Sequence, residues 1–288
     1  MYLRDLNKAT GVIRLIRPVN CVMIGVAVVV GAVLAESEVI LQQVRNLTLG
    51  FLTGFFLTAS TMALNDFCDR EIDVVNEPNR PIPSGSVSSL EAALLGVILA
   101  AMGFVTASLT NWQCLLVSSA AWVLFVLYTT RGKRMGFVGN LMVSACVSVP
   151  FIYGSFAVNK VFLPTSAIFV AIVFLSNTGR EIVKGIVDLH GDEKSKINTI
   201  AVRFGAKKAA FVSAIFYLAA IGLTPLPKFL GIISFWFLPL IVVTDVGLAS
   251  ATFMLLSDPS RDTARKTKNQ NLLWFSIALL AFMAGVVF

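Results

Sequence analysis

The sequence is poor in charged residues and contains a single histidine. Charged residues make up 14% of its 288 residues, whereas hydrophobic residues make up 57%. A soluble domain carries about 25% charged residues, so this composition argues against a soluble protein. His190 is expected to be a loop residue, and neither a Ser-His-Asp set nor a Walker-type glycine-rich loop is recognised. The four cysteines are scattered without metal-ligand spacing and are expected to be apolar filler.

Long apolar runs dominate the chain instead. Nine of them reach membrane-spanning length, and each is expected to be a helix because lipid offers the backbone no hydrogen-bond partners. The expected spans are about 18–36, 47–68, 89–109, 112–130, 137–158, 161–187, 207–225, 229–256 and 269–288. The sequence therefore predicts an all-α integral membrane protein with nine transmembrane helices.

Basic residues are distributed unevenly between the two sides of these spans. If the N-terminal side is the inside, the outer segments keep only Arg45, Lys160 and Lys228 of the twenty-three Lys and Arg residues. This bias predicts a multi-pass protein of the cell membrane with a cytoplasmic N-terminus, cytoplasmic active-site loops and an outside C-terminus. The net charge of +7 fits loops that face anionic lipid, so no nucleic-acid partner is expected.

A dense acidic stretch follows the second span. Asn65, Asp66, Asp69 and Asp73, here called the first cluster, lie in the run N-D-F-C-D-R-E-I-D, and Arg80 follows in N-R-P-I-P-S-G. In a continuing helix, Asn65, Asp69 and Asp73 are four residues apart and share a face, with Asp66 beside them. Like charges at this spacing repel one another, and a bound cation removes that cost. Carboxylate and amide oxygens suit Mg²⁺, which often shares its coordination sphere with substrate phosphates.

A second polar stripe continues the sixth span. Arg180, Lys184, Asp188 and Asp192 follow at successive four-residue steps, and Glu181 lies on the same side of the helix. Ion pairs that stabilise the helix end are one explanation of this stripe. Ionisable groups inside a hydrophobic span more often face a functional cavity, and we favour that interpretation for Arg180 and Lys184.

The two acidic groups follow the second and the sixth spans. This spacing favours one domain over 1–288 with a possible four-helix repeat, about 18–130 and 137–256, followed by the ninth helix at 269–288. Asp188 and Asp192 are here called the second cluster. Two carboxylate clusters that face one cavity can hold two divalent cations, which make a diphosphate a better leaving group. Candidates for further phosphate contacts are Arg80, Arg131, Lys133, Arg180 and Lys184.

These motifs resemble those of a known family. The run N-D-x-x-D-x-x-x-D from Asn65, with N-R-P-I-P-S-G from Asn79, resembles the first Asp-rich motif of the UbiA superfamily of intramembrane prenyltransferases. Asp188-x-x-x-Asp192 resembles the second motif, and the resemblance extends over the whole chain. It implies a helical bundle around a central cavity that opens laterally to lipid, with the Asp-rich motifs on the cytoplasmic side.

The resemblance also implies roles for individual residues. It implies that two Mg²⁺ ions bind to Asn65, Asp66, Asp69, Asp73, Asp188 and Asp192. The five aspartates in this set are the expected catalytic residues. The expected diphosphate-binding residues are Arg80, Tyr128, Arg131 and Lys133. Tyr128 and Lys133 depart from the usual Tyr-x-x-x-Lys spacing of the family.

Within the superfamily, the run G-R-E-I-V-K from Gly179 resembles archaeal enzymes of ether-lipid synthesis. These transfer a geranylgeranyl group from its diphosphate to the free hydroxyl of geranylgeranylglyceryl phosphate. Such an acceptor needs cations beyond those that serve the diphosphate, and Arg180 and Lys184 are expected to supply them. The expected partners are therefore a prenyl diphosphate, a lipid phosphate and membrane lipids, with no obligate protein partner.

Alternatives to this function stay open at this point. An aromatic or tetrapyrrole acceptor of quinone or chlorophyll synthesis is one, because the run N-E-P from Asn76 resembles chlorophyll synthases. A secondary transporter is a remote one, because transporter sites lie near the membrane midplane and both clusters here lie at helix ends. The group that accepts the proton of the acceptor hydroxyl is also left open. It could be a spare carboxylate of the first cluster, pyrophosphate or water.

Overall fold

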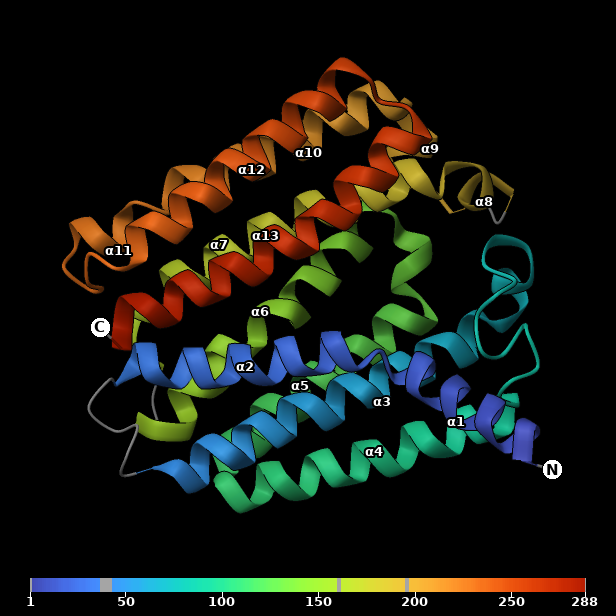
Figure 1. Ribbon diagram of the computed structural model, residues 1–288, viewed down its shortest axis with the longest axis horizontal. Coiled ribbons are helices and arrows are strands. Elements are labelled where there is room, and N and C mark those ends of the chain that lie inside the picture. Colours follow the sequence, from blue (N-terminus) through green and yellow to red (C-terminus); the bar gives the residue numbers. More distant parts are fainter. Residues whose placement is uncertain (1, 37–42, 160–161, 195–196, 288) are drawn as a thin grey trace.

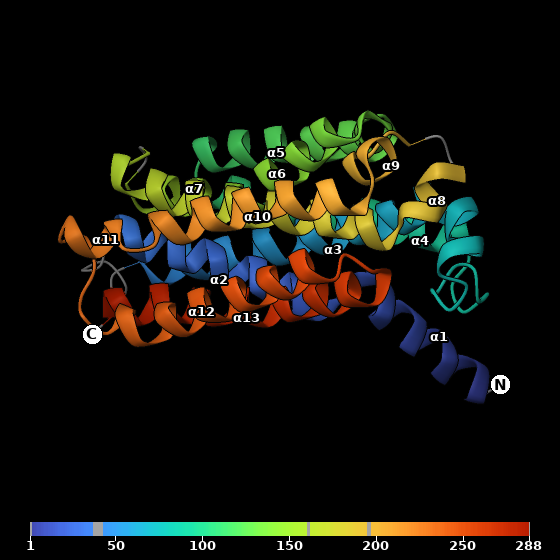
Figure 2. The same ribbon diagram turned by 90° about the horizontal axis from the view of Figure 1, so that it is seen from above.

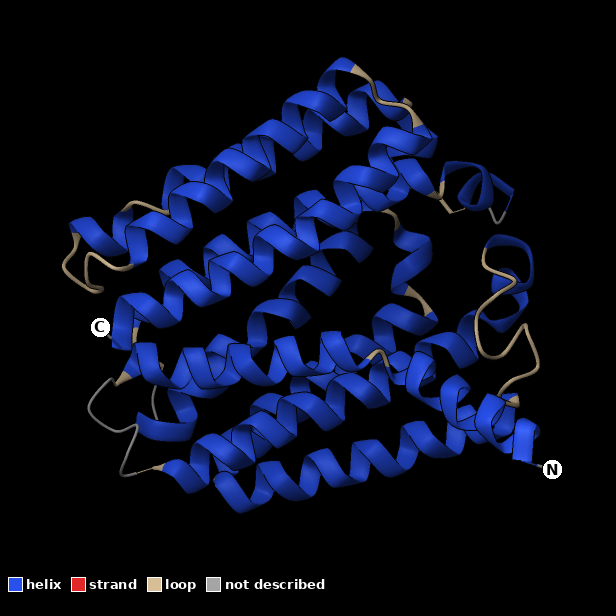
Figure 3. Cartoon of the chain, viewed as in Figure 1, coloured by secondary structure: helices blue, strands red, loops and turns tan. Residues whose placement is uncertain are grey.

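The computed structural model describes residues 2–36, 43–159, 162–194 and 197–287. In these residues the chain forms helices joined by loops, and no strand occurs among them (Figure 3). The first part contains α1 (Tyr2–Ile16), α2 (Pro18–Ala35), α3 (Val44–Asn76), α4 (Ser89–Thr110), α5 (Trp112–Thr130) and the 3₁₀ helix η2 (Gly132–Met135). The second part contains α6 (Phe137–Asn159), α7 (Pro164–Val187), α8 (Leu189–Lys194), α9 (Ile200–Phe204), α10 (Ala206–Leu223), α11 (Leu226–Phe229), α12 (Phe237–Ser257) and α13 (Arg261–Val287).

Nine helices in the described ranges are long and apolar enough to cross a membrane, which confirms the expected number of spans. The eighth begins at Phe237 rather than near 229, because the short helix α11 and a turn at Gly231 (φ 68°) precede it. The ninth begins at Arg261, earlier than expected, so its first two turns carry charged residues. Three expected positions lie outside the described residues: the start of the sixth span at 161, the end of the ninth span at 288, and the outer residue Lys160. The four-helix repeat stays a prediction.

The acidic stretch does continue the second span as one helix. α3 runs without interruption to Asn76, and Pro78, Pro81 and Pro83 follow in the connection to α4. α4 then begins with a capping box, in which Ser88 and Glu91 each accept a hydrogen bond from the other's backbone N–H. The first cluster is therefore held on a regular helix rather than on a loop.

The polar connections gather at one end of the bundle. Figure 1 shows α8, α9 and the α3–α4 connection at the same end as α1, whereas the last turns of α13 lie at the other end. α1 projects away from the bundle (Figure 2). The break before α2 lies at Arg17, whose φ of 51° is in the left-handed region, followed by Pro18.

The opposite end of the bundle is closed by apolar packing. The rings of Phe169 and Phe237 pack against Phe282, with centroid distances of 5.0 and 5.9 Å. Small residues let α2 and α6 approach closely, because a Cβ on Gly154 would lie 2.3 Å from the backbone nitrogen of Ala32. The bundle is thus sealed at one end and polar at the other.

Candidate active site

A cavity of about 590 Å³ extends from the polar end into the membrane-spanning part of the bundle. One stripe of α3 follows it from Thr53 to Glu77, and the remaining lining comes from α2, α5, α6, η2, α7, α8, α13 and nearby loop residues. The residues from Thr53 to Asp69 alone correspond to about 24 Å of helix at 1.5 Å per residue. The cavity is therefore long, with charged residues at one end and largely apolar residues along its interior.

The charged lining of the cavity is balanced. Among the described residues, its acidic side chains are Asp69, Asp73, Glu77, Glu181, Asp188 and Asp192. Its basic side chains are Arg17, Arg80, Lys133, Arg180, Lys184 and Lys268. Charges concentrated away from bulk water are costly unless they are paired or bind a ligand. The way in which these twelve groups are paired therefore indicates where ligands fit.

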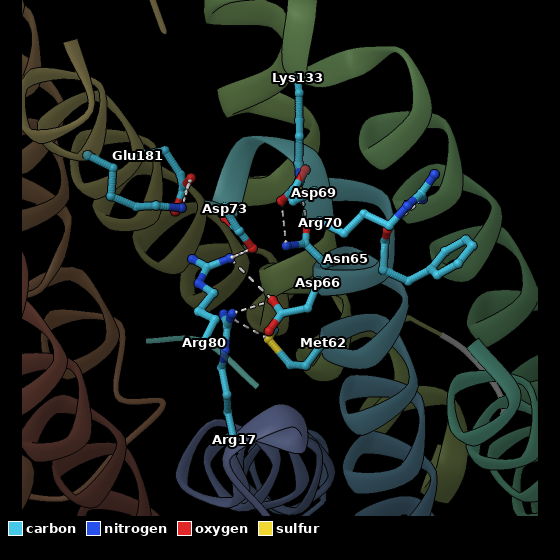
Figure 4. Close-up of polar contacts among 12 residues, drawn as sticks. Arg17, Met62, Asn65, Asp66, Asp69, Arg70, Asp73, Arg80, Lys133 and Glu181 are labelled. Atoms are coloured by element: carbon cyan, nitrogen blue, oxygen red, sulfur yellow. Dashed lines mark hydrogen bonds and ion pairs between the residues drawn. The ribbon is translucent and has the colours of Figure 1, made fainter. Parts of the chain in front are cut away.

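In the first cluster, Asn65 and Asp69 share a lysine (Figure 4). Asn65 Nδ2 donates to Asp69 Oδ2 at 2.9 Å, and Lys133 Nζ donates to Asn65 Oδ1 at 2.7 Å and to Asp69. Burial lowers the pKa of Lys133, and the Asp69 charge opposes that effect. The following Gly136 (φ 59°) fixes this loop, because any Cβ there would collide with the carbonyl oxygen of Asn198.

Asp66 lies behind the cavity rather than on it. Its side chain is only 2% exposed and does not line the cavity. Its Oδ1 accepts from Arg17 Nη2 at 2.7 Å and from Arg80 Nη1 at 3.3 Å. Arg80 Nη1 also donates to Asp73 Oδ2 at 2.6 Å (Figure 4). Since Asp66 points about 100° away from the Asn65–Asp69–Asp73 face, it positions two arginines instead of facing the ligand space.

The second cluster has a different electrostatic state. Asp188 caps the end of α7, Asp192 lies on α8, and no ion pair reaches either carboxylate in the described part of the chain. Burial raises the pKa of Asp188, and burial together with the Asp188 charge raises that of Asp192 to about 7. The charges of Lys184 and Lys268 oppose this effect at Asp188, and the charge of Lys184 opposes it at Asp192. Half-buried carboxylates without a direct ion pair among the described residues are suited to a hard divalent cation. Within the described ranges, however, no three His, Cys, Asp or Glu side chains are already grouped as a metal site.

Arg180 and Lys184 pair with a glutamate rather than with the second cluster. Lys184 Nζ donates to Glu181 Oε2 at 2.7 Å, and Arg180 Nη1 reaches Glu181 Oε1 at 3.5 Å. Arg180 Nε is buried and has no hydrogen-bond partner among the described residues. The α7 end of the cavity therefore holds cationic donors that its own side chains do not satisfy.

Most of the predicted site residues come together in this cavity. Asn65, Asp69, Asp73, Arg80, Tyr128, Lys133, Arg180, Lys184, Asp188 and Asp192 all line it. The prediction for Arg131 is not supported by its position, because this residue is exposed at the end of α5 and does not line the cavity. Lys133 lines it despite the unusual spacing, and its Nζ lies 5.7 Å from the Tyr128 ring centroid.

The sequence reasoning missed two basic residues. Arg17 lines the cavity from the α1–α2 break, and Lys268 lines it from the first turns of α13. In the sequence, both are ordinary positive residues beside a span. The one available signal was the position of Arg17 immediately before a proline at the start of the first span.

Fold and site together define an integral, multi-pass membrane protein whose cavity joins two acidic clusters to an apolar interior. The chain belongs to the UbiA prenyltransferase family, which it matches over residues 24–286. It is 34% identical to the digeranylgeranylglyceryl phosphate synthase of Archaeoglobus fulgidus, over 94% of this chain and 93% of that protein. The Pyrococcus horikoshii synthase of the same name is 32% identical, over 96% of each chain.

Solved structures show the same fold. A structure of a digeranylgeranylglyceryl phosphate synthase matches with a TM-score of 0.75 and 30% identity, covering 97% of this chain and 99% of that one. A UbiA homologue from Archaeoglobus fulgidus, bound to GPP and Mg²⁺, matches with a TM-score of 0.64 and 17% identity, covering 95% and 99% of the chains. The predicted bundle is thereby confirmed.

Proposed function

We propose that this protein transfers a geranylgeranyl group from geranylgeranyl diphosphate to the hydroxyl of geranylgeranylglyceryl phosphate, with Mg²⁺ as cofactor. The product is digeranylgeranylglyceryl phosphate. The observation that carries this proposal is a single cavity with both acidic clusters at one end and about 24 Å of largely apolar interior beyond Asp69. A prenyl diphosphate has the same two parts, a charged head and a long apolar tail. The names of the relatives in Archaeoglobus and Pyrococcus support the choice of acceptor.

The diphosphate head would bind between the two clusters. Asn65, Asp69 and Asp73 on one side and Asp188 and Asp192 on the other would hold two Mg²⁺ ions, whose positive charge would make the diphosphate a better leaving group. Arg17, Arg80 and Lys133 are held beside the first cluster by Asp66, Asp73 and Asp69. They donate to the oxygens on which negative charge develops as the carbon–oxygen bond breaks.

The reacting carbon acquires positive charge next to aromatic side chains. Phe125, Tyr128 and Phe275 line the cavity, and the face of an aromatic ring attracts a cation. The largely apolar lining of this part of the cavity would limit the access of water, which would protect the allylic cation from hydrolysis. The acceptor hydroxyl then has no competitor for the carbon.

The acceptor's phosphate would bind on the α7 side of the cavity. Arg180 Nε has no partner among the residues that the structure describes, and Lys184 and Lys268 line the same region. These donors are distinct from the three basic residues held by the first cluster. The residues beside the first cluster can therefore bind the diphosphate, while those on the α7 side bind the phosphate of the acceptor.

The orientation in the membrane is part of this proposal. Most basic residues lie at the end of the bundle that carries α1, α8 and α9, and this bias favours a cytoplasmic N-terminus and active site. Nine spans then leave the C-terminus outside. A C-terminal alkaline phosphatase fusion should be active and a C-terminal fluorescent-protein fusion dark; the reverse pattern would contradict the orientation.

Purified protein in lipid nanodiscs tests the reaction directly. Supplied with geranylgeranyl diphosphate and Mg²⁺, it should convert geranylgeranylglyceryl phosphate to the doubly prenylated lipid, identified by mass spectrometry. EDTA or Asp188→Asn should abolish the product while the variant retains its melting temperature. Transfer to an aromatic acceptor with none to the lipid phosphate would refute the acceptor, and unchanged turnover in EDTA would refute the metal.

A further inference from the structure

Glu181 is a cavity carboxylate outside both acidic clusters. It lies on α7, is 6% exposed, and faces the first cluster across the site (Figure 4). Its two carboxylate oxygens are turned toward the two basic residues on the same helix, Arg180 and Lys184. It is neither a member of an Asp-rich motif nor a residue that the proposed metal and diphosphate contacts require.

A purely structural ion pair explains this arrangement poorly. The contact from Arg180 Nη1 is long, at 3.5 Å, and Arg180 Nε has no partner in the described part of the chain. A buried ion pair stabilises a protein only when its geometry is good and its remaining donors are satisfied. Lys184 and Arg180 between them have eight N–H donors, and Glu181 accepts two bonds from them. Lys184 is 36% exposed and can also bond water, whereas the buried Nε of Arg180 has no partner among the described residues and is the donor that an anion would satisfy.

The acceptor's chemistry complements this group. Geranylgeranylglyceryl phosphate carries its phosphate and its free hydroxyl on one three-carbon glycerol unit, so the two are never far apart. Arg180 and Lys184 lie one residue before and three residues after Glu181, on the same side of α7. A phosphate bound to these two cations places the hydroxyl within reach of the Glu181 carboxylate.

We propose that Glu181 is the general base that takes the proton from the acceptor hydroxyl, an inference that rests on the proposed function. The hydroxyl oxygen forms a bond to the first carbon of the geranylgeranyl group. The bond between that carbon and the diphosphate oxygen breaks, and its electron pair leaves with pyrophosphate. The hydroxyl proton passes to a Glu181 oxygen and is released to water before the next turnover, so atoms and charge balance.

Acceptor binding also frees the base. A phosphate that binds Arg180 and Lys184 competes with Glu181 for the same donors. The carboxylate then turns from its ion pairs toward the hydroxyl. The Glu181 carboxylate thus becomes available to take a proton only when a phosphorylated acceptor is present. The ion pairs of the resting state keep it from reacting before then.

The decisive variant is Glu181→Gln, which keeps the size of the side chain and one acceptor oxygen but cannot serve as a base. General-base catalysis contributes roughly 10²- to 10⁴-fold to rates, so kcat should fall by at least about 100-fold while KM for the acceptor changes less than about threefold. Glu181→Ala should recover turnover when formate is added, because a small carboxylate fills the vacated place.

Glu71→Gln is the matched control. Glu71 lies on α3 but its side chain is 85% exposed and outside the cavity, so wild-type kinetics are expected. Unchanged kcat in Glu181→Gln, or a rise in acceptor KM alone, would overturn the general base and leave Glu181 as a partner of the two cations. An inactive wild-type protein would instead overturn the proposed function, so the two failures are distinguishable.

Discussion

Replacing Lys133 by methionine should change Mg²⁺ binding and diphosphate binding in opposite directions. Lys133 Nζ donates to Asn65 Oδ1 and Asp69 Oδ2, two of the oxygens that the first cluster would offer to a metal ion. The lysine and Mg²⁺ therefore compete for the same ligands. Methionine retains a side chain of similar length without the charge, so the competition ends.

The magnitude follows from the contact. Two unit charges about 4 Å apart interact by about 4 kcal/mol at an effective dielectric constant of about 20. The side chains of Lys133 and Asp69 are 20% and 16% exposed, so water screens this pair only in part. Lysine can also turn away from an arriving ion. We therefore expect Mg²⁺ alone to bind about 10- to 100-fold more tightly to Lys133→Met, or about 1.4 to 2.7 kcal/mol.

Diphosphate binding should weaken in the same variant. A hydrogen bond to a charged group contributes about 1.5 to 3 kcal/mol, so an unreactive thiolo analogue of the prenyl diphosphate should bind about 10- to 100-fold less tightly. Thermal-shift titrations with Mg²⁺ alone and with the analogue measure both effects, because a ligand that binds the folded state raises its stability. Lys207→Met, exposed on α10 and outside the cavity, should change neither affinity. Weaker or unchanged Mg²⁺ binding in Lys133→Met would refute the competition.

Three further predictions concern the site and its scaffold. Because the pKa of Asp192 is raised to about 7, protons compete with Mg²⁺ below that pH, and the Mg²⁺ concentration for half-maximal activity should rise about tenfold from pH 8 to pH 6; a constant value would contradict the assignment. Asp66→Asn removes the carboxylate that pairs with Arg17 and leaves Arg80 held by Asp73 alone, so KM for the diphosphate should rise at least about tenfold while Mg²⁺ binding in thermal-shift titrations stays within about threefold; lost Mg²⁺ binding would make Asp66 a ligand. Gly154→Ala should destabilise the protein by about 1 to 3 kcal/mol and lower its melting temperature, whereas Gly222→Ala, with open space around it, should not; equal melting temperatures would refute the tight α2–α6 contact.

The spans and the continuous α3 helix could be predicted because an apolar segment that crosses lipid must satisfy its backbone hydrogen bonds internally, as a helix does. The late start of α12 could not, because it depends on the short helix α11 and on the positive φ of Gly231. The approximate location of the site followed from the spacing of Asp69, Asp73 and Asp188. Its electrostatic state did not, because ion pairing depends on contacts between distant parts of the sequence.

Periodicity carried more information about the first cluster than the motif did. Asn65, Asp69 and Asp73 share a helical face, and the structure places all three on the cavity. Asp66 belongs to the same motif but lies off that face, and it holds basic residues instead. Motif membership alone did not distinguish a residue that faces a ligand from one that positions other residues.

The two clusters differ in how their charge is balanced, and this difference gives them an order of use. Mg²⁺ that enters the first cluster must displace Lys133 from Asp69, and removing a partner from a buried pair is costly. At Asp188 and Asp192 no ion pair among the described residues has to break, and a cation would offset both the burial and the Asp188 charge that raise the pKa of Asp192. The second cluster is therefore the more favourable place for the first ion. The first cluster becomes available when the diphosphate arrives, because its oxygens accept the hydrogen bonds that Lys133, Arg17 and Arg80 otherwise give to carboxylates. We therefore expect Arg17, Arg80 and Lys133 to balance the charge of the first cluster before substrate binds and to donate to the diphosphate afterwards.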